Sequence, residues 1–208
     1  TITGSISGSF LNNYVSSSAG VSGGAINNSG NGSIASINDV RFYNNRATTT
    51  GTSSAVIGGA INNNSGQIGT ISGSFEDNYA TAVGIAFGGA IENEGGSITS
   101  ISDTTFSGNY VRSENGKARG GAIENANSGS ITGGIANSKF ISNNVTGKDF
   151  ALGGAISNGS YGPWSQLGGN IGDISADFSL NSVTSVTGWA KGGAIDNARH
   201  VGTWSTGG

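Results

Sequence analysis

The stretch GGAIENEGGSITSISDTTFSGNYV, residues 88–111, contains the two phrases that decide the fold. Its first four residues, GGAI, occur six times in the chain, and its FSGN is one of six copies of a second phrase, Phe-x-x-Asn. The GGAI copies begin at Gly23, Gly58, Gly88, Gly120, Gly153 and Gly192. The Phe-x-x-Asn copies begin at Phe10, Phe42, Phe75, Phe106, Phe140 and Phe178. Successive copies lie 30 to 39 residues apart, a period typical of solenoids, propellers and arrays.

A pair of isoleucines is the third repeated feature. The pairs are Ile2/Ile6, Ile34/Ile37, Ile68/Ile71, Ile98/Ile101, Ile131/Ile135 and Ile171/Ile174. Each repeat therefore has three short segments rich in Ile, Phe, Val and Thr, separated by Gly, Ser and Asn, which is typical of strands and turns. No apolar stripe follows the i, i+3, i+4 spacing of a helix. The sequence predicts an all-β parallel β-helix of about six three-strand coils, forming a single domain over residues 1–208.

Stacked coils place equivalent residues above one another at the strand spacing of about 4.8 Å, so each repeated position becomes a ladder. We expect an inward isoleucine ladder from the GGAI phrases and an inward ladder of the six phenylalanines. We also expect two ladders of stacked asparagine amides. The first comprises Asn28, Asn63, Asn93, Asn125, Asn158 and Asn197. The second comprises Asn13, Asn45, Asn78, Asn109, Asn143 and Asn181. The glycine pairs suit a bend that needs positive φ or close approach to the next coil.

Composition limits the functional classes. The 208 residues include 39 glycines, one proline, no cysteine and no methionine, and the formal net charge is −3. Without cysteine there is no disulfide scaffold and no thiolate metal site. A weakly acidic chain with 10% charged residues is a poor partner for nucleic acid. The sequence shows neither a signal peptide nor an apolar run long enough for a membrane helix, and we interpret it as a fragment of a longer protein.

The paired phrases resemble the passenger repeats of polymorphic membrane proteins and of other bacterial autotransporters. The second phrase reads FLNN, FYNN, FEDN, FSGN, FISN and FSLN in its six copies, and together the two phrases cover nearly the whole chain. The resemblance implies a right-handed β-helix passenger domain on the bacterial surface. It also implies an adhesive role and an outer-membrane barrel at the C-terminal end of the parent protein.

The position after each GGAI is where chemistry is most plausible. Its occupants are Asn27, Asn62, Glu92, Glu124, Ser157 and Asp196. If the isoleucine points inward, alternation turns this position outward, and Glu92 and Glu124 become neighbours about 4.8 Å apart. Two carboxylates so close form a candidate acid/base pair or a weak candidate site for a hard cation. The alternative, which we favour, is two solvated glutamates relieved by Lys117 and Arg119. We assign no catalytic residue and no cofactor.

The stretch Tyr110–Arg119 is a candidate binding loop, because recognition by a solenoid takes place on its lateral surface. It contains Arg112, Lys117 and Arg119, a third of the nine basic residues. The only histidine, His200, has no repeat partner and no catalytic context.

Aromatic residues near the C-terminal end form a second candidate surface. The longest insertion, Gly159–Asn170, contains Tyr161 and Trp164, and Trp189 follows in the next coil. Such rings stack on sugars or other ligands at interfaces. The alternative is that Trp164 and Trp189 pack together with Trp204 as a structural cluster.

The sequence therefore predicts an extracellular, surface-displayed adhesin or scaffold that binds host-cell or glycan ligands through lateral loops, and that can self-associate. The alternative is a β-helical polysaccharide lyase or glycoside hydrolase, for which Glu92, Glu124, Lys117 and Arg119 are the candidate set. Ice binding by a flat threonine face is a third possibility, but the matching positions are too irregular to favour it.

Overall fold

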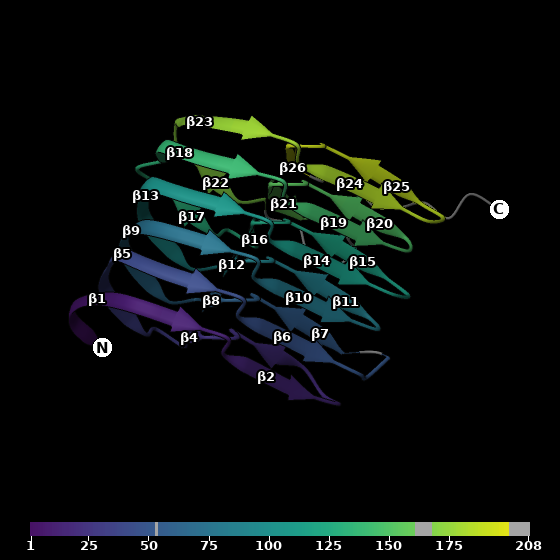
Figure 1. Cartoon of the computed structure of the whole chain (residues 1–208), viewed down its shortest axis with the longest axis horizontal. Coiled ribbons are helices and arrows are strands. Elements are labelled where there is room, and N and C mark those ends of the chain that lie inside the picture. Colours follow the sequence, from purple (N-terminus) through teal and green to yellow (C-terminus); the bar gives the residue numbers. More distant parts are fainter. Residues whose placement is uncertain (53, 161–167, 200–208) are drawn as a thin grey trace.

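The predicted parallel β-helix is confirmed. The computed structural model describes residues 1–52, 54–160 and 168–199, and these form strands and turns without a helix. The chain winds through about five turns, stacked from the N-terminal coil at one end to the C-terminal coil at the other (Figure 1). Within these ranges there is accordingly no helix of the length and apolarity needed to cross a membrane.

Four parallel sheets, here named A to D, run along the solenoid. Sheet A contains β1 (Ile2–Leu11), β5 (Ser33–Tyr43), β9 (Gln67–Glu76), β13 (Ser97–Ser107), β17 (Ser130–Ile131), β18 (Ile135–Ile141), β22 (Asn170–Ile171) and β23 (Ile174–Ser179). Sheet B contains β2 (Tyr14–Ser17), β6 (Arg46–Thr49), β10 (Tyr79–Ala82), β14 (Tyr110–Ser113), β19 (Asn144–Gly147) and β24 (Ser182–Ser185). Sheet C contains β3 (Val21–Ser22), β7 (Ala55–Ile57), β11 (Ile85–Phe87), β15 (Lys117–Arg119), β20 (Phe150–Leu152) and β25 (Trp189–Lys191). Sheet D contains β4 (Ile26–Ser29), β8 (Ile61–Asn64), β12 (Ile91–Glu94), β16 (Ile123–Ala126), β21 (Ile156–Ser160) and β26 (Ile195–Arg199).

The strands are divided differently from the three per coil expected. The isoleucine pair and the phenylalanine share one long strand of sheet A; β13, for example, contains Ile98, Ile101 and Phe106. Where a corner was expected, the strand has only a register irregularity, between Ile101 and Thr104, with Asp103 at φ 51°. A bulge of this kind bends a strand without ending it. The residues after the asparagine then form the two additional short strands of sheets B and C.

The solenoid has two apolar cores. Between sheets A and D lies a thick core of isoleucine and phenylalanine, including Ile61, Phe75 and Ile101. Between sheets B and C lies a thin core of alanine and valine, including Ala80 and Val111. Sheets B and C therefore form a flat wing that projects from the thicker A/D body (Figure 1).

The phenylalanines stack as predicted. Neighbouring rings in the ladder from Phe10 to Phe178 have centroids 4.6 to 4.9 Å apart and are tilted by 5° to 12°. Four of these rings, Phe42, Phe75, Phe106 and Phe140, are fully buried. The spacing is set by the strands, so the rings pack face to face at the distance that the backbone pairing dictates.

The asparagine of Phe-x-x-Asn connects successive coils at the A/B corner. Asn109 Nδ2 donates to the carbonyl of Phe75 in the preceding coil at 2.8 Å and to Asn143 Oδ1 in the next coil at 2.9 Å. Its Oδ1 accepts from the backbone N–H and from Nδ2 of Asn78, both at 3.0 Å. Each buried amide is thus fully hydrogen-bonded, which explains why the two ends of the phrase recur together.

The other predicted asparagine ladder lies at the D/A corner. Each Nδ2 donates to the Oδ1 of the next coil, for example Asn63 to Asn93 and Asn93 to Asn125, both at 2.7 Å. The six-membered ladder from Asn28 to Asn197 is continuous. Both ladders expected from the repeats are therefore confirmed.

The glycine pair of GGAI makes the bend from sheet C to sheet D. The first glycine has φ between 60° and 72° in all six copies, a region that disfavours other residues. In the first five copies, a Cβ on the second glycine would lie 2.0 Å from a carbonyl oxygen in the next coil, as between Gly89 and Gly121. The predicted positive φ and close approach are both present, one on each glycine.

We expect Gly89→Ala to lower the free energy of unfolding by about 4 kcal/mol or more, because the added methyl group would force two coils apart. Gly4→Ala is the matched control, since a Cβ there would meet nothing within 4 Å. It should change the stability by less than about 0.5 kcal/mol. Urea denaturation of both variants checks this, and a Gly89→Ala protein as stable as Gly4→Ala would contradict the stacking described.

Candidate functional site

Sheets C and D meet at a concave corner, which we call the elbow. In β15, Ala118 packs in the B/C core, so alternation turns Arg119 to the opposite face. In β16, Ile123 packs in the A/D core, so Glu124 is also turned away from its core. Arg119 Nη1 nevertheless lies 3.2 Å from Glu124 Oε1. The outward faces of the two sheets therefore contact each other across the elbow.

Two ladders of side chains line the elbow. The ladder on sheet C comprises Ser22, Ile57, Phe87, Arg119, Leu152 and Lys191. The ladder on sheet D is the position after each GGAI: Asn27, Asn62, Glu92, Glu124, Ser157 and Asp196. An apolar and basic wall thus faces a polar and acidic wall along the solenoid axis.

The expectation that Glu92 and Glu124 are solvated is wrong. They point away from the A/D core, as alternation requires, but only 1% and 0% of their surface is exposed. The outward face of sheet C covers them. Of the two cations expected to relieve them, Arg119 makes the ion pair with Glu124, whereas the ammonium of Lys117 lies 5.4 Å from the centre of the Phe150 ring.

Burial makes both carboxyl groups weaker acids than solvated glutamate side chains. It raises the pKa of Glu124 to about 7, and the nearby Arg119 charge limits the rise. Burial also raises the pKa of Glu92 well above its ordinary value, and the neighbouring Glu124 raises it further. Asp196, two coils beyond Glu124, has a raised pKa for the same reason, opposed by Lys191 and Arg119. At neutral pH the elbow therefore retains protons that solvated carboxylates would release.

The elbow also contains unsatisfied polar atoms. Across the described residues, every buried side-chain nitrogen or oxygen that lacks a hydrogen-bond partner belongs to its two ladders. These atoms are Asn62 Oδ1, Glu92 Oε2, Arg119 Nε, both carboxylate oxygens of Glu124, Ser157 Oγ and Asp196 Oδ2. Buried polar groups without partners are rare and costly, so their concentration in one place marks the elbow as the unusual part of an otherwise well-satisfied fold.

Arg119 is held by more than its ion pair. Its guanidinium carbon lies 3.9 Å from the centre of the Phe87 ring, one coil below. Its Nη1 also approaches the carbonyl of Gly159 at 3.5 Å. A cation over an aromatic face and beside a carboxylate is stabilised by both, although removal from water costs much of that gain.

The chemical capacity of the elbow is limited by access. Two carboxyl groups one strand spacing apart, about 4.8 Å, are close to the separation found in retaining glycosidases. A glycosidic oxygen would have to contact the acid, however, and both groups are enclosed. Among the described residues no group of three or more acidic or histidine side chains is arranged to hold a metal ion, so the weak cation candidate gains no third such ligand.

The expected binding loop is not a loop. Tyr110–Arg119 forms β14 and β15, joined by a tight turn, on the two opposite sheets of the wing. Arg112 therefore faces outward from sheet B, where it lies 4.0 Å from Glu114, while Lys117 and Arg119 face outward from sheet C. The structure separates residues that the sequence suggested would act together, because alternating residues in the paired strands point to opposite outer faces.

Trp189 joins Lys117 and Arg119 on the outer face of sheet C. Its ring makes an edge-on contact with Phe150 at 5.4 Å, and Lys191 Nζ lies 4.9 Å from its centre. The remaining candidates, Tyr161 and Trp164, lie outside the described residues.

Sequence reasoning missed a ladder on the outer face of sheet B, which we call the tyrosine–arginine ladder: Tyr14, Arg46, Tyr79 and Tyr110. The guanidinium of Arg46 lies 4.2 Å from the centre of the Tyr14 ring, and its Nη1 donates to the hydroxyl of Tyr79 at 3.0 Å. Tyr79 and Tyr110 stack at 4.8 Å. The signal was present, since each residue directly follows the asparagine of a Phe-x-x-Asn phrase.

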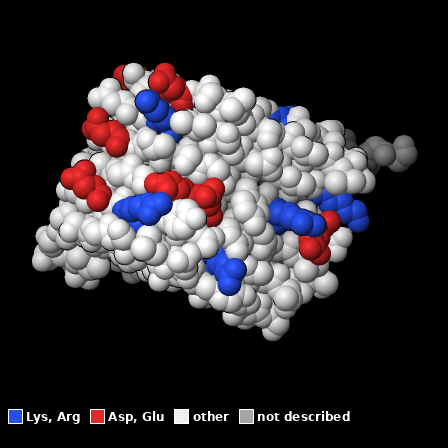
Figure 2. Space-filling view, viewed as in Figure 1, with Lys and Arg blue, Asp and Glu red and all other residues white. Residues whose placement is uncertain are grey.

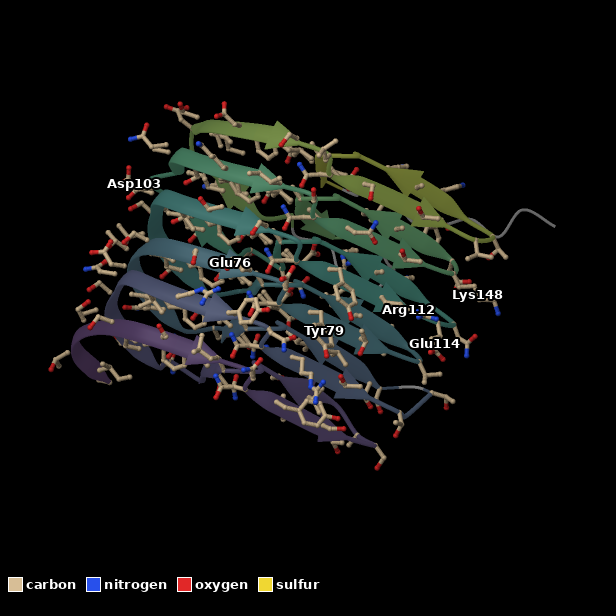
Figure 3. The ribbon with its side chains drawn as sticks, in the orientation of Figure 1. Glu76, Tyr79, Asp103, Arg112, Glu114 and Lys148 are labelled. Atoms are coloured by element: carbon tan, nitrogen blue, oxygen red, sulfur yellow. The ribbon has the colours of Figure 1, made fainter. Side chains whose placement is uncertain are left out.

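The tyrosine–arginine ladder lies on an open face. Figure 2 shows that this side of the molecule is mostly uncharged, with its basic and acidic side chains gathered mainly in a few small mixed groups. Tyr79 lies on this face between Glu76 and Arg112 (Figure 3). Arg46 and Tyr14 are exposed, the latter by 53%.

Comparison with known proteins identifies no relative: no protein-family model matches the chain, and no curated protein or solved structure is significantly similar to it.

We expect Arg119→Met to destabilise the protein by about 3 kcal/mol at about pH 8, where Glu124 is ionised, because it leaves that charge buried without a partner. Methionine keeps most of the packing on Phe87. Adding Glu124→Gln should restore much of the loss, since the double variant has no buried charge to compensate. Urea denaturation of the two single variants and the double variant measures this coupling, and strictly additive effects would contradict the ion pair.

Proposed function

We propose that this chain is a β-helical passenger domain of the autotransporter type, displayed at a bacterial surface, where it acts as an adhesin or scaffold. The repeat phrases and the confirmed solenoid support the proposal, because a long stack of coils presents a rigid lateral surface to partners. The proposal includes an extracellular location, host-cell or glycan ligands, self-association, and an outer-membrane barrel elsewhere in the parent protein.

The ligand-binding part of this proposal is based on the tyrosine–arginine ladder. Arg46 is fixed between the Tyr14 ring and the Tyr79 hydroxyl, and no carboxylate of the described residues pairs with it. Its free N–H groups therefore face solvent in a set orientation. A planar guanidinium held in this way suits a carboxylate ligand, which it binds through two parallel hydrogen bonds.

The surroundings of the ladder suit a sugar. Two residues along each strand, the hydroxyl groups of Thr48 and Thr81 lie 3.1 Å apart on the same face. Hydroxyl, phenol and guanidinium groups in a row can exchange hydrogen bonds with the hydroxyl groups of a saccharide. We therefore favour acidic glycans as ligands, with the acidic group at Arg46 and the chain running along the ladder.

The enclosure of Glu92 and Glu124 supports a binding role over a catalytic one. Their raised pKa values and close spacing favour the alternative, a polysaccharide-cleaving enzyme. That alternative requires substrate to reach groups that are at most 1% exposed. Turnover of acidic polysaccharides that is lost in Glu124→Gln would overturn the non-enzymatic reading.

We expect Arg46→Ala to weaken binding to acidic glycans at least about tenfold, because a charge-assisted bidentate contact is lost. Tyr79→Ala should weaken binding too, since it removes the hydroxyl group that orients Arg46. A glycan array with neutral and acidic saccharides, followed by calorimetry on the best ligand, measures both effects.

Lys148→Ala is the matched control. Lys148 is an exposed cation at the tip of the wing, away from Tyr79 (Figure 3). Lys148→Ala therefore changes the net charge by the same amount as Arg46→Ala but leaves the ladder intact. Its binding should equal that of the unmodified protein. If no glycan binds, or if Arg46→Ala and Lys148→Ala bind alike, this surface is not the ligand site.

A further inference from the structure

The ladder on sheet D has a direction in its hydrogen bonding. Asn62 Nδ2 donates to Asn27 Oδ1 of the preceding coil at 2.8 Å. The other end of the same amide, Asn62 Oδ1, is buried and has no partner. The next residue of the ladder is Glu92, in register with Asn62. A donor at position 92 would continue the pattern that Asn62 begins.

Glu92 supplies such a donor only in its acid form. An ionised carboxylate accepts hydrogen bonds and donates none, whereas the protonated group has one O–H. Glu92 Oε2 and Asn62 Oδ1 lack hydrogen-bond partners, whereas Glu124 Oε1 has Arg119 as its ion-pair partner. With both glutamates ionised, three consecutive positions of the ladder would present only acceptors to one another.

The position of Arg119 decides which glutamate carries the proton. Its Nη1 is 3.2 Å from Glu124 Oε1, so the charge of Glu124 is compensated. Glu92 makes no ion pair among the described residues, and the same-coil residue across the elbow is the apolar Phe87. One cation and one proton thus neutralise two enclosed carboxyl groups.

Other charged groups around the elbow do not change this assignment. From sheet D, Glu94, Glu124 and Asp196 add negative charge. From sheet C, Arg119 acts on Glu92 and Glu124, and Lys191 acts on Asp196. The acidic groups outnumber the basic ones, which favours retention of a proton on the glutamate that lacks a cation.

We propose that Glu92 is a proton-binding site whose acid form donates its single O–H to Asn62 Oδ1, so that protonation closes the elbow between sheets C and D and deprotonation loosens it. The partner is the proton itself, and the inference does not depend on the adhesive role. It assigns a role to Asn62 Oδ1 and Glu92 Oε2, two of the buried polar atoms of the described residues that lack a partner.

The direction of the two pKa shifts determines whether stability rises or falls with pH. In the unfolded chain the glutamates release their protons near the ordinary value of 4.5, while in the folded chain Glu124 does so at about 7 and Glu92 above its ordinary value. Between those limits the folded state binds more protons than the unfolded state, so stability falls as pH rises. Below the ordinary pKa of 4.5 the glutamates are protonated in both the folded and the unfolded state, and their full contribution to stability is present.

Urea denaturation with the variant Glu92→Gln tests the proposal. The unmodified protein should lose about 1 M in its urea midpoint between about pH 5 and about pH 8. Glutamine has nearly the same shape and donates through its amide at any pH, so Glu92→Gln should lose less, and the loss that remains is the titration of Glu124. Glu114→Gln, which removes an exposed carboxylate from the wing tip, should keep the full loss. A midpoint of the unmodified protein that is flat or rises over this range, or an equal loss in Glu92→Gln, would overturn the proposal.

A second measurement needs no variant. Amide hydrogen exchange of the unmodified protein, corrected for intrinsic rates, should show protection in β12 and β16 falling at least about tenfold from about pH 5 to about pH 8. Protection in β13 of sheet A should change much less, because β13 does not line the elbow. Equal changes in the three strands would contradict a local proton site even if Glu92→Gln failed to fold.

Discussion

Every feature of this protein depends on the vertical pairing of its coils. Each strand hydrogen-bonds in parallel to the strand at the same position in the neighbouring turns, so a residue's nearest neighbours are the residues at its own position in the repeat. Side chains that can stack on themselves are therefore favoured. Phenylalanine does so by ring stacking, isoleucine by apolar contact and asparagine by amide hydrogen bonds.

The same constraint is unfavourable for charged residues. A glutamate placed above a glutamate meets its own charge one strand spacing away, and this is the situation of Glu92 and Glu124. On an exposed face water would screen the two charges, but the elbow excludes water from them. The ion pair with Arg119 and a retained proton compensate the two charges. The buried atoms of the elbow that still lack partners show that this compensation is incomplete.

The repeats made much of the fold predictable from sequence. The spacing of GGAI and Phe-x-x-Asn predicts the solenoid and its isoleucine, phenylalanine and asparagine ladders, because a fixed period forces equivalent residues into register. Two glycines in a row predict a tight bend, since positive φ and close backbone approach both exclude side chains. The extra strands of the wing were not predicted, because Ala and Val segments such as β10 are short and carry no phrase of their own.

The candidate site was harder to predict. Alternation correctly turns Glu92 away from the A/D core, but it cannot show that sheet C folds back over that face. The angle between two sheets is set by the backbone of the bend and by the thin alanine core of the wing, and neither leaves a local signal at position 92. The separation of Arg112 from Lys117 has the same origin, because their strands lie on opposite sides of the wing.

The most direct test of this account is the titration of the two carboxyl groups themselves. Carbon-13 NMR of selectively labelled glutamate in the folded protein reports each side chain separately as pH changes. We predict that Glu124 titrates at about 7 and that Glu92 remains protonated well above its ordinary value. If both groups instead ionise near 4.5, like solvated glutamates, the enclosed elbow and its proton are contradicted.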